Sequence, residues 1–203
     1  MIKNIIFDLG GVLLDFNPKN YLIHCNLNDD EIELFTKMIW GSDEWKKCDR
    51  GDINFKEMIE EICINNPTYS KKIQYVLENY NNNLILSEMP NSYEFVKRLK
   101  NKGFDIYFLS NVNDYILKYD QDTFRVFELI KGGVYSCEEN YAKPELEIYQ
   151  ILLKKYNLLP EECLFIDDNL SNIRASSSIG INSVIFTDLQ DTKKKIDNML
   201  NIK

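Results

Sequence analysis

Acidic and small polar side chains follow three short apolar runs of the sequence, at the points where the runs end. Asp8 follows Ile-Ile-Phe, and the pair Asp167 and Asp168 follows Phe-Ile. Ser110 and Asn111 follow a third run, which ends in Phe-Leu. If these runs are neighbouring parallel strands, the polar groups converge on one crevice at the carboxyl edge of the sheet. Carboxylates brought together there would repel one another unless a hard cation such as Mg²⁺ neutralised them.

A lysine completes this set of groups. Lys143 precedes Pro144 at the start of a predicted helix and supplies a compact positive charge suited to phosphate. The chemistry that the set fits is phosphoryl transfer through a carboxylate nucleophile. Taken singly, each group has a structural explanation: a Ser-Asn pair is typical of turns, and Asp-Asp-Asn can cap a helix that starts near Leu170. The functional interpretation therefore depends on the groups being found together.

The elements that must position these groups alternate between strand and helix. A capping-box pattern of Asn91 with Glu94 predicts one helix, which Gly103 can close in a left-handed conformation, and Pro144 opens another. Such alternation predicts an α/β fold with a Rossmann-like parallel sheet covered on both faces. The runs of β-branched and aromatic residues that predict its strands are Ile2 to Phe7, Phe104 to Leu109, Cys163 to Ile166 and Ser183 to Phe186.

Residues 17–87 break this rhythm, because they contain amphipathic stretches and no convincing strand. Helix starts are predicted where Asn28 is followed by Glu31 and where Asn54 is followed by Glu57. We interpret the segment as a helical cap inserted after the first strand. It would lie over the carboxyl ends of the strands, where open α/β sheets bind ligands, and is therefore a candidate lid.

This interpretation divides the chain into two parts. The α/β core comprises residues 1–16 and 88–203, and the cap comprises residues 17–87. Asn81 to Asn83 are expected to form a loop where the insertion returns to the sheet.

Composition bounds the class of protein. The 203 residues leave room for one domain with an insertion, and 44% of them are apolar, enough to bury a substantial core. A net charge of −8 argues against nucleic acid as a partner. Apolar stretches fall short of the ~20 residues that a membrane span needs, so we expect a cytoplasmic protein with no membrane partner. Five cysteines without a C-x-x-C pair indicate reduced thiols.

Four segments, FDLGGVLLD, LSNVN, AKPE and FIDDN, resemble in this order the four motifs of the haloacid dehalogenase (HAD) superfamily. The resemblance covers essentially the whole chain. Within the superfamily, the sequence is similar to the subfamily IA branch. This branch contains sugar-phosphate phosphatases, including bacterial α-glucose-1-phosphatase, and the phosphatase domain of soluble epoxide hydrolases. The resemblance implies a HAD-type phosphoric monoester hydrolase that acts on a small phosphorylated metabolite, such as a sugar 1-phosphate.

The resemblance also implies a role for each residue around the phosphate. Asp8 would attack phosphorus and become an aspartyl phosphate, which water then hydrolyses. Ser110 and the backbone N–H of Asn111 would hold phosphoryl oxygens, and Lys143 would offset the charge that develops on the transferring group.

A metal site follows from the same resemblance. Mg²⁺ would be held by the Asp8 carboxylate, the main-chain carbonyl of Gly10 and the Asp168 carboxylate. Asp167 would orient Lys143, although the roles of the two adjacent aspartates could be reversed.

The sequence departs from the family pattern at Gly10, where most phosphatases of the superfamily carry the aspartate that protonates the leaving oxygen. Such assistance contributes about 10² to 10⁴ in rate. Asp15, a tempting substitute, is expected to have a hinge or hydrogen-bonding role. Loss of the acid hurts least when the leaving group departs easily, which favours an anomeric sugar phosphate.

Two other functions stay open. A 2-haloacid dehalogenase also uses a carboxylate nucleophile, but it needs no metal, so the acidic pair argues against it. A non-catalytic HAD-like binding protein would explain Gly10 as a mark of lost activity.

The motifs do not cover the cap, so the exact substrate and the oligomeric state stay open as well. His24 is expected to be structural or solvent-facing, and Trp40 and Trp45 to pack within the lid rather than to form a ligand platform. Trp45, Asp49 and Arg50 are the candidates for contact with the part of the substrate beyond its phosphate, although we expect Arg50 to be an exposed surface residue.

Overall fold

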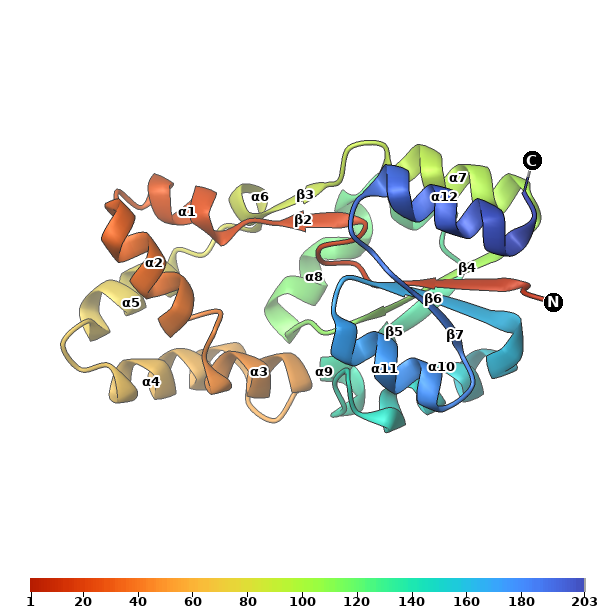
Figure 1. Cartoon of the computed structure of the whole chain (residues 1–203). Helices are drawn as coiled ribbons and strands as arrows, with labels where there is room; N and C mark the ends of the chain where they lie inside the picture. Colours follow the sequence, from red (N-terminus) through yellow and green to blue (C-terminus); the bar gives the residue numbers. More distant parts are fainter. Residues whose placement is uncertain (203) are drawn as a thin grey trace.

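The molecule consists of a five-stranded parallel sheet with helices on both faces and a group of helices at one end (Figure 1). The computed structural model describes residues 1–202, and for residues 118–122 it describes the backbone alone. The strand order in the sheet is β5-β4-β1-β6-β7. This arrangement confirms the predicted α/β class with a Rossmann-like sheet.

The strands are short, and four of the five in the sheet lie within a residue or two of the predicted runs. Their bounds are β1 Asn4–Phe7, β4 Asp105–Ser110, β5 Gly132–Tyr135, β6 Cys163–Asp167 and β7 Asn182–Ile185, with β2 Leu14–Phe16 and β3 Leu86–Glu88 forming a separate antiparallel pair.

The helices fall into two groups, one at the end of the molecule and one around the sheet. The first group comprises α1 Pro18–His24, α2 Asp29–Met38, α3 Asp43–Arg50, α4 Phe55–Asn65, α5 Ser70–Glu78 and α6 Asn82–Ile85. The second comprises α7 Ser92–Asn101, α8 Asp114–Thr123, α9 Ser136–Glu139, α10 Leu146–Tyr156, α11 Leu170–Ser178 and α12 Leu189–Leu200, with 3-10 turns at Arg125–Leu129 and Pro160–Glu162.

The central strand β1 is buried on both faces, which explains the apolar run from Ile5 to Phe7. Ile5 and Phe7 belong to one core cluster, whereas Ile6 belongs to the other, because side chains alternate across a strand. Helices α7 and α12 cover one face of the sheet, and α10 and α11 cover the opposite face (Figure 1). The sheet is thereby held rigid around β1.

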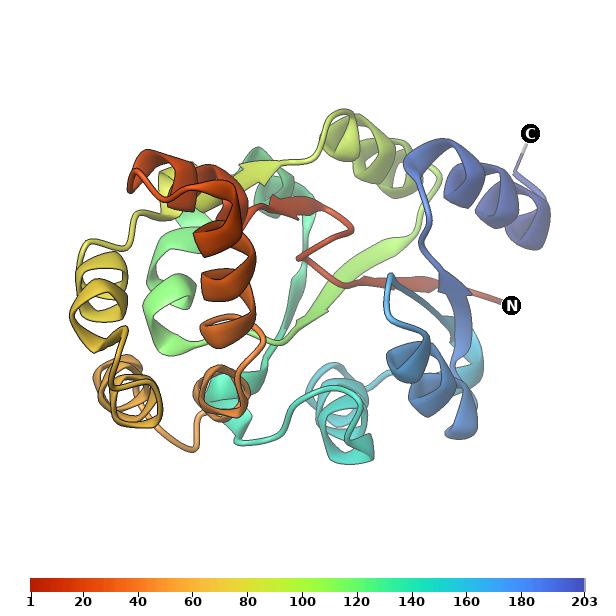
Figure 2. The same cartoon turned by 60° about the vertical axis from the view of Figure 1, so that its left-hand side comes forward.

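The helices of residues 18–78 lie beyond the β2–β3 pair, to one side of the sheet (Figure 2). Phe55 of α4 stacks on Tyr115 of α8 with ring centroids 4.4 Å apart, so the two parts of the molecule are in contact. Strand β3 crosses the predicted boundary between residues 87 and 88. The division into core and cap stays a prediction.

Two of the three predicted capping boxes are confirmed. Asn28 and Asn54 each accept from a backbone N–H three residues on, and the glutamates return the bond. The capping box at Asn91 was wrong. Asn91 has a left-handed backbone with φ +66° and makes no side-chain capping bond. Gly103 has the expected left-handed conformation, with φ +92°.

Two further local predictions were wrong. The segment from Asn81 to Asn83 is not a loop, because the Asn81 side chain accepts from the Asn83 N–H and caps the short helix α6. The helix expected to open at Pro144 begins at Leu146 instead.

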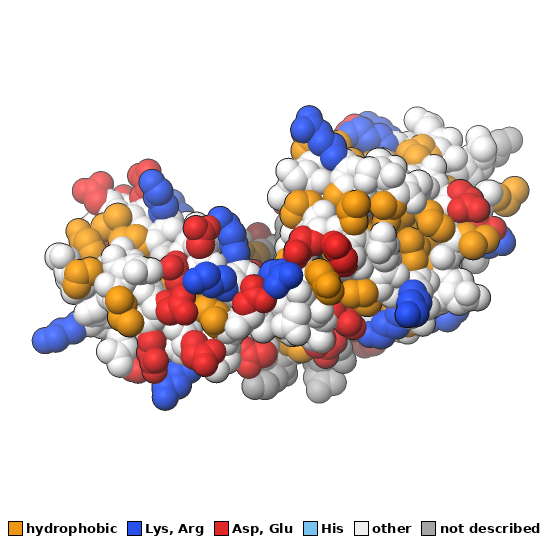
Figure 3. Space-filling model, turned by 90° about the horizontal axis from the view of Figure 1, so that it is seen from below, with side chains coloured by type: hydrophobic (Ala, Val, Ile, Leu, Met, Phe, Trp, Pro, Cys, Tyr) orange, Lys and Arg blue, Asp and Glu red, His pale blue; other side chains and the backbone are white. Residues whose placement is uncertain are grey.

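The surface reflects the composition. Acidic side chains lie on both parts of the molecule on the face seen in Figure 3, with lysines and arginines scattered among them. None of the helices described in residues 1–202 has the length and apolar character needed to cross a membrane.

Candidate active site

The carboxyl ends of three adjacent strands place the predicted residues together. Because β1 lies between β4 and β6, Asp8, Ser110 and Asp167 stand side by side at one edge of the sheet. The edge opens into a cavity of about 400 Å³. All six predicted site residues line this cavity, namely Asp8, Gly10, Ser110, Asn111, Lys143 and Asp168.

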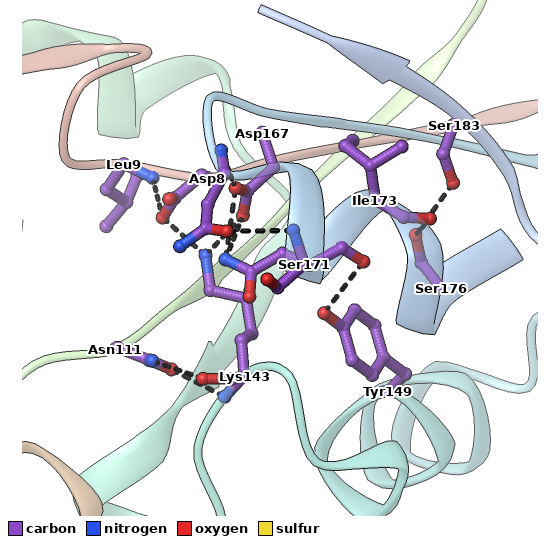
Figure 4. Close-up of polar contacts among 12 residues, drawn as sticks. Asp8, Leu9, Asn111, Lys143, Tyr149, Asp167, Ser171, Ile173, Ser176 and Ser183 are labelled. Carbon is purple, nitrogen blue, oxygen red and sulfur yellow. Dashed lines mark hydrogen bonds and ion pairs between the residues drawn. The ribbon is translucent and has the colours of Figure 1, made fainter.

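Lys143 forms the centre of the charged group (Figure 4). Its side chain is 1% exposed, and Nζ lies 2.7 Å from Oδ1 of Asp8 and 2.8 Å from Oδ2 of Asp167. Burial lowers the pKa of Lys143, but the two carboxylates outweigh this effect, and the net shift is upward. Lys143 is therefore a fixed cation beside the Asp8 carboxylate.

The side chain of Asn111 positions the lysine backbone. Its Oδ1 accepts from the Lys143 N–H at 2.8 Å, and its Nδ2 donates to the Lys143 carbonyl at 2.9 Å. The sequence assigned a role only to the backbone N–H of Asn111. The side-chain clamp was missed, because it joins segments 32 residues apart.

Asp167 is fully buried, and its contacts are directed at the protein. Asn172 Nδ2 lies 3.0 Å from each of its carboxylate oxygens, and the Asn169 N–H donates to Oδ1 at 2.8 Å. Asp168, by contrast, is exposed and lines the cavity. Asn172 was missed in the sequence, although its spacing from Asp167, one turn into α11, was the signal that could have identified it.

Burial, together with the neighbouring carboxylates, raises the pKa values of Asp8 and Asp168. Burial raises the pKa of Asp8 to about 7, with Lys143 opposing the shift and Asp167 and Asp168 adding to it. Burial and Asp167 also raise the pKa of Asp168. Lys143 therefore does not fully offset the effects of burial and of the neighbouring carboxylates.

The residues present fit a divalent cation. Carboxylate oxygens of Asp8, Asp167 and Asp168 all lie within 4.8 Å of one another. Three carboxyl groups face the single ammonium of Lys143, and a divalent cation would offset the negative charge that Lys143 leaves uncompensated. Asn172 Oδ1 is buried without a hydrogen-bond partner and belongs to the cavity wall. Oxygen donors of this kind are the ligands that Mg²⁺ prefers.

The far wall of the cavity is built by the helical group and the β2–β3 pair. Trp45 and Asp49 of α3 line it, together with apolar side chains such as Phe16 and Leu86. Trp45 is also buried against Trp40, with ring centroids 5.8 Å apart.

The other candidates for a functional role lie outside this wall. Arg50 Nε donates to Oε2 of Glu145 at 2.9 Å and so ties α3 to the loop before α10. Asp15 lies in β2, where it pairs with Ser87. His24 is exposed.

The buried Lys143 and its flanking carboxylates lie at the switch point of a Rossmann-like parallel sheet, where open α/β sheets bind ligands. A family model for haloacid dehalogenase-like hydrolases matches residues 2–180. The chain belongs to this family, which confirms the resemblance seen in its motifs.

Relatives and solved structures agree with this membership. Sesquiterpene phosphatase astK of Aspergillus oryzae is 25% identical, over 92% of this chain and 90% of its own length. D-ribitol-5-phosphate phosphatase of Bacteroides thetaiotaomicron is 24% identical, over 99% of this chain and 100% of its own length. A HAD family enzyme from the same bacterium, in complex with magnesium and inorganic phosphate, superposes with a TM-score of 0.71 at 23% identity, covering 95% of this chain and 99% of the other.

Proposed function

We propose that this protein is a Mg²⁺-dependent phosphatase that hydrolyses a small phosphorylated metabolite through an aspartyl-phosphate intermediate. One observation carries the proposal. The Asp8 carboxylate lines the cavity, 2.7 Å from the buried ammonium of Lys143 and within 4.8 Å of the Asp168 carboxylate. A carboxylate so placed can attack phosphorus while its neighbours hold the charges of the phosphoryl group.

Five residues at the carboxyl edge of the sheet have roles in this reaction. Asp8 provides the nucleophilic oxygen, and Ser110 and the Asn111 N–H bind phosphoryl oxygens. Lys143 stabilises the developing negative charge, and Asp167 holds Lys143 in place. Because Asp167 is occupied by Lys143 and Asn172, we assign the cation to the more accessible Asp168.

A bound cation would offset the negative charge of the carboxylates in the cavity. Asp8, the Gly10 carbonyl and Asp168 would hold Mg²⁺, which supplies Lewis-acid stabilisation of the phosphoryl oxygens when bound. Support comes from the solved HAD family enzyme that binds magnesium with inorganic phosphate, and from the two phosphatases among the relatives.

The substrate we propose is a sugar phosphate, with a sugar 1-phosphate as the first candidate. Gly10 offers no side chain to protonate the leaving oxygen, and an anomeric hydroxyl leaves more easily than an ordinary alcohol. The relative whose name specifies ribitol 5-phosphate, a polyol phosphate, gives this substrate class further support.

A phosphatase screen tests the proposal. The purified protein is assayed for phosphate release from a panel that includes glucose 1-phosphate, glucose 6-phosphate and p-nitrophenyl phosphate, with Mg²⁺ and with EDTA. We expect turnover that EDTA abolishes and Mg²⁺ restores, and that Asp8→Asn lacks. Halide release from 2-chloropropionate without metal would favour a dehalogenase, and no turnover on any substrate would favour a binding protein.

A further inference from the structure

The structure raises the question of which group supplies the proton that Gly10 cannot. In an in-line displacement the leaving oxygen departs on the side of phosphorus opposite the attacking carboxylate. With Asp8 on the sheet edge, that side faces α3 and the β2–β3 pair. Among the residues that line the cavity from this side, Asp49 has the titratable side chain. The others named above, Trp45, Phe16 and Leu86, have no proton to exchange near neutral pH.

The core holds Asp49 in a fixed position. Asn113 Nδ2 donates to the Asp49 carboxylate at 3.1 Å, and the Ser136 hydroxyl donates to the Asp49 backbone carbonyl. Asn113 is itself fixed, because its Oδ1 accepts from the Ile116 N–H at 3.1 Å and caps α8. Ser136 also accepts from the Val112 N–H at 2.9 Å. The carboxyl is thus anchored to the loop that follows the phosphate-binding residues.

The surroundings of Asp49 suit proton transfer. Burial raises its pKa to about 7, while hydrogen bonds with Asn113 and Trp45 act in the opposite direction. The titratable groups facing it are Cys48, Cys137 and Tyr80, whose pKa values burial raises, so they stay neutral. The charged groups across the cavity are Asp8, Lys143 and Asp168. A general acid works best when its pKa is near the working pH.

We propose that Asp49 is the proton donor for the leaving oxygen, taking the place of the aspartate that the loop after β1 lacks. The proposal rests on the phosphatase function proposed above. As the Asp8 oxygen bonds to phosphorus, the bond between phosphorus and the leaving oxygen breaks, and its electron pair stays on that oxygen. The oxygen takes the Asp49 proton and departs as an alcohol, leaving Asp49 as a carboxylate.

The second half of the reaction restores both carboxyls. Water attacks phosphorus and gives a proton to the Asp49 carboxylate, while the bond between phosphorus and Asp8 breaks with its electron pair returning to Asp8. Inorganic phosphate leaves, and Asp49 is protonated again. A donor on α3 removes the reason given above for preferring a sugar 1-phosphate, so phosphates of ordinary alcohols also become substrates.

Dependence on the leaving group distinguishes this role from a structural one. Wild type and Asp49→Asn are compared in kcat on glucose 6-phosphate, whose alkoxide needs a proton, and on p-nitrophenyl phosphate, whose phenolate does not. We expect Asp49→Asn to lose about 10² to 10⁴ on glucose 6-phosphate and less than about tenfold on p-nitrophenyl phosphate. Asn can still accept the bond from Asn113, so the anchor is kept.

Two further variants complete the experiment. Asp43→Asn makes the same change in the first turn of α3, where the carboxylate is exposed and paired with Lys46, and should match wild type on both substrates. Asp49→Glu keeps an acid and should retain more of the glucose 6-phosphate rate than Asp49→Asn.

Four outcomes would overturn the proposal. An equal loss on both substrates, or no loss in Asp49→Asn, would show that Asp49 does not donate the proton. Equal glucose 6-phosphate rates for the Glu and Asn variants would show the same. A wild type that releases phosphate from no substrate of the panel would instead remove the proposed phosphatase function, and the role of Asp49 with it.

Discussion

Gly11 lies directly against the Asp168 carboxylate, so a substitution there probes the proposed metal site without changing a ligand. A Cβ at position 11 would lie 3.0 Å from Cγ of Asp168 and closer still to Oδ2. Carbon atoms normally approach to about 3.5–4.0 Å, so the carboxylate of Asp168 must move by about 0.5–1 Å in Gly11→Ala. Mg²⁺ requires ligands at about 2.0–2.1 Å in near-ideal octahedral geometry. We expect a loss of about 10- to 100-fold in Mg²⁺ affinity, the range seen when the support of a ligand is disturbed.

The backbone of Gly11 adds a second effect that needs a control. Its φ of +75° is left-handed, and a side chain there costs about 1–2 kcal/mol of stability. Gly103 has a φ of +92° and no heavy atom within 4 Å of an added Cβ, so Gly103→Ala carries the strain alone.

Mg²⁺ titration by calorimetry, together with chemical denaturation, separates the two effects. Both variants should lose similar stability, and only Gly11→Ala should lose Mg²⁺ affinity. Equal Mg²⁺ affinity in the two folded variants would refute the reasoning.

Three further predictions concern the charges around the site. Lys143→Met should lower kcat on phosphate esters by at least about 10² to 10³, because Asp8 and the phosphoryl group lose their fixed cation. Steady-state kinetics with saturating Mg²⁺ measures this loss, and near-wild-type turnover would contradict the prediction. Asn172→Ala should lower the free energy of unfolding by about 1–3 kcal/mol in urea denaturation, since the buried Asp167 loses two contacts, and an unchanged midpoint would count against that role. The pKa of Asp49 is raised to about 7 and only its protonated form donates, so the ratio of kcat/KM for glucose 6-phosphate in wild type to that in Asp49→Asn should fall as pH rises through about 7. Identical pH profiles for the two proteins would exclude this assignment.

Strands whose sequences reflect only their own burial could be predicted, whereas β5 could not. β1 and β6 are apolar because both faces of the sheet are covered, and this pattern is visible in the sequence alone. β5 begins with Gly132 and Gly133, residues that disfavour strands. An added Cβ at Gly133 would collide with the Phe108 ring, so the glycine meets a packing need of the neighbouring strand. The local sequence of β5 does not indicate this packing requirement.

The same distinction applies to the site. Residues at strand ends could be placed together, because parallel strands share one carboxyl edge. The side-chain clamp of Asn111 on Lys143, and the contact of Asn113 with Asp49, depend on how loops and α3 dock, and no spacing in the sequence encodes that docking. Asp49 was a candidate for substrate contact, and its anchoring by Asn113 became visible only in the structure.

Trapping the covalent intermediate tests the central claim most directly. The Mg²⁺-loaded enzyme is mixed with a substrate found in the screen and quenched in acid within one turnover, and the tryptic peptide covering residues 4–19 is analysed by mass spectrometry. We expect a phosphoryl group on Asp8 that requires Mg²⁺ and is absent from Asp8→Asn. Phosphate release with this peptide unmodified, a phosphoryl group on another residue, or an ester of a 2-hydroxy acid formed on Asp8 from a haloacid, would contradict it.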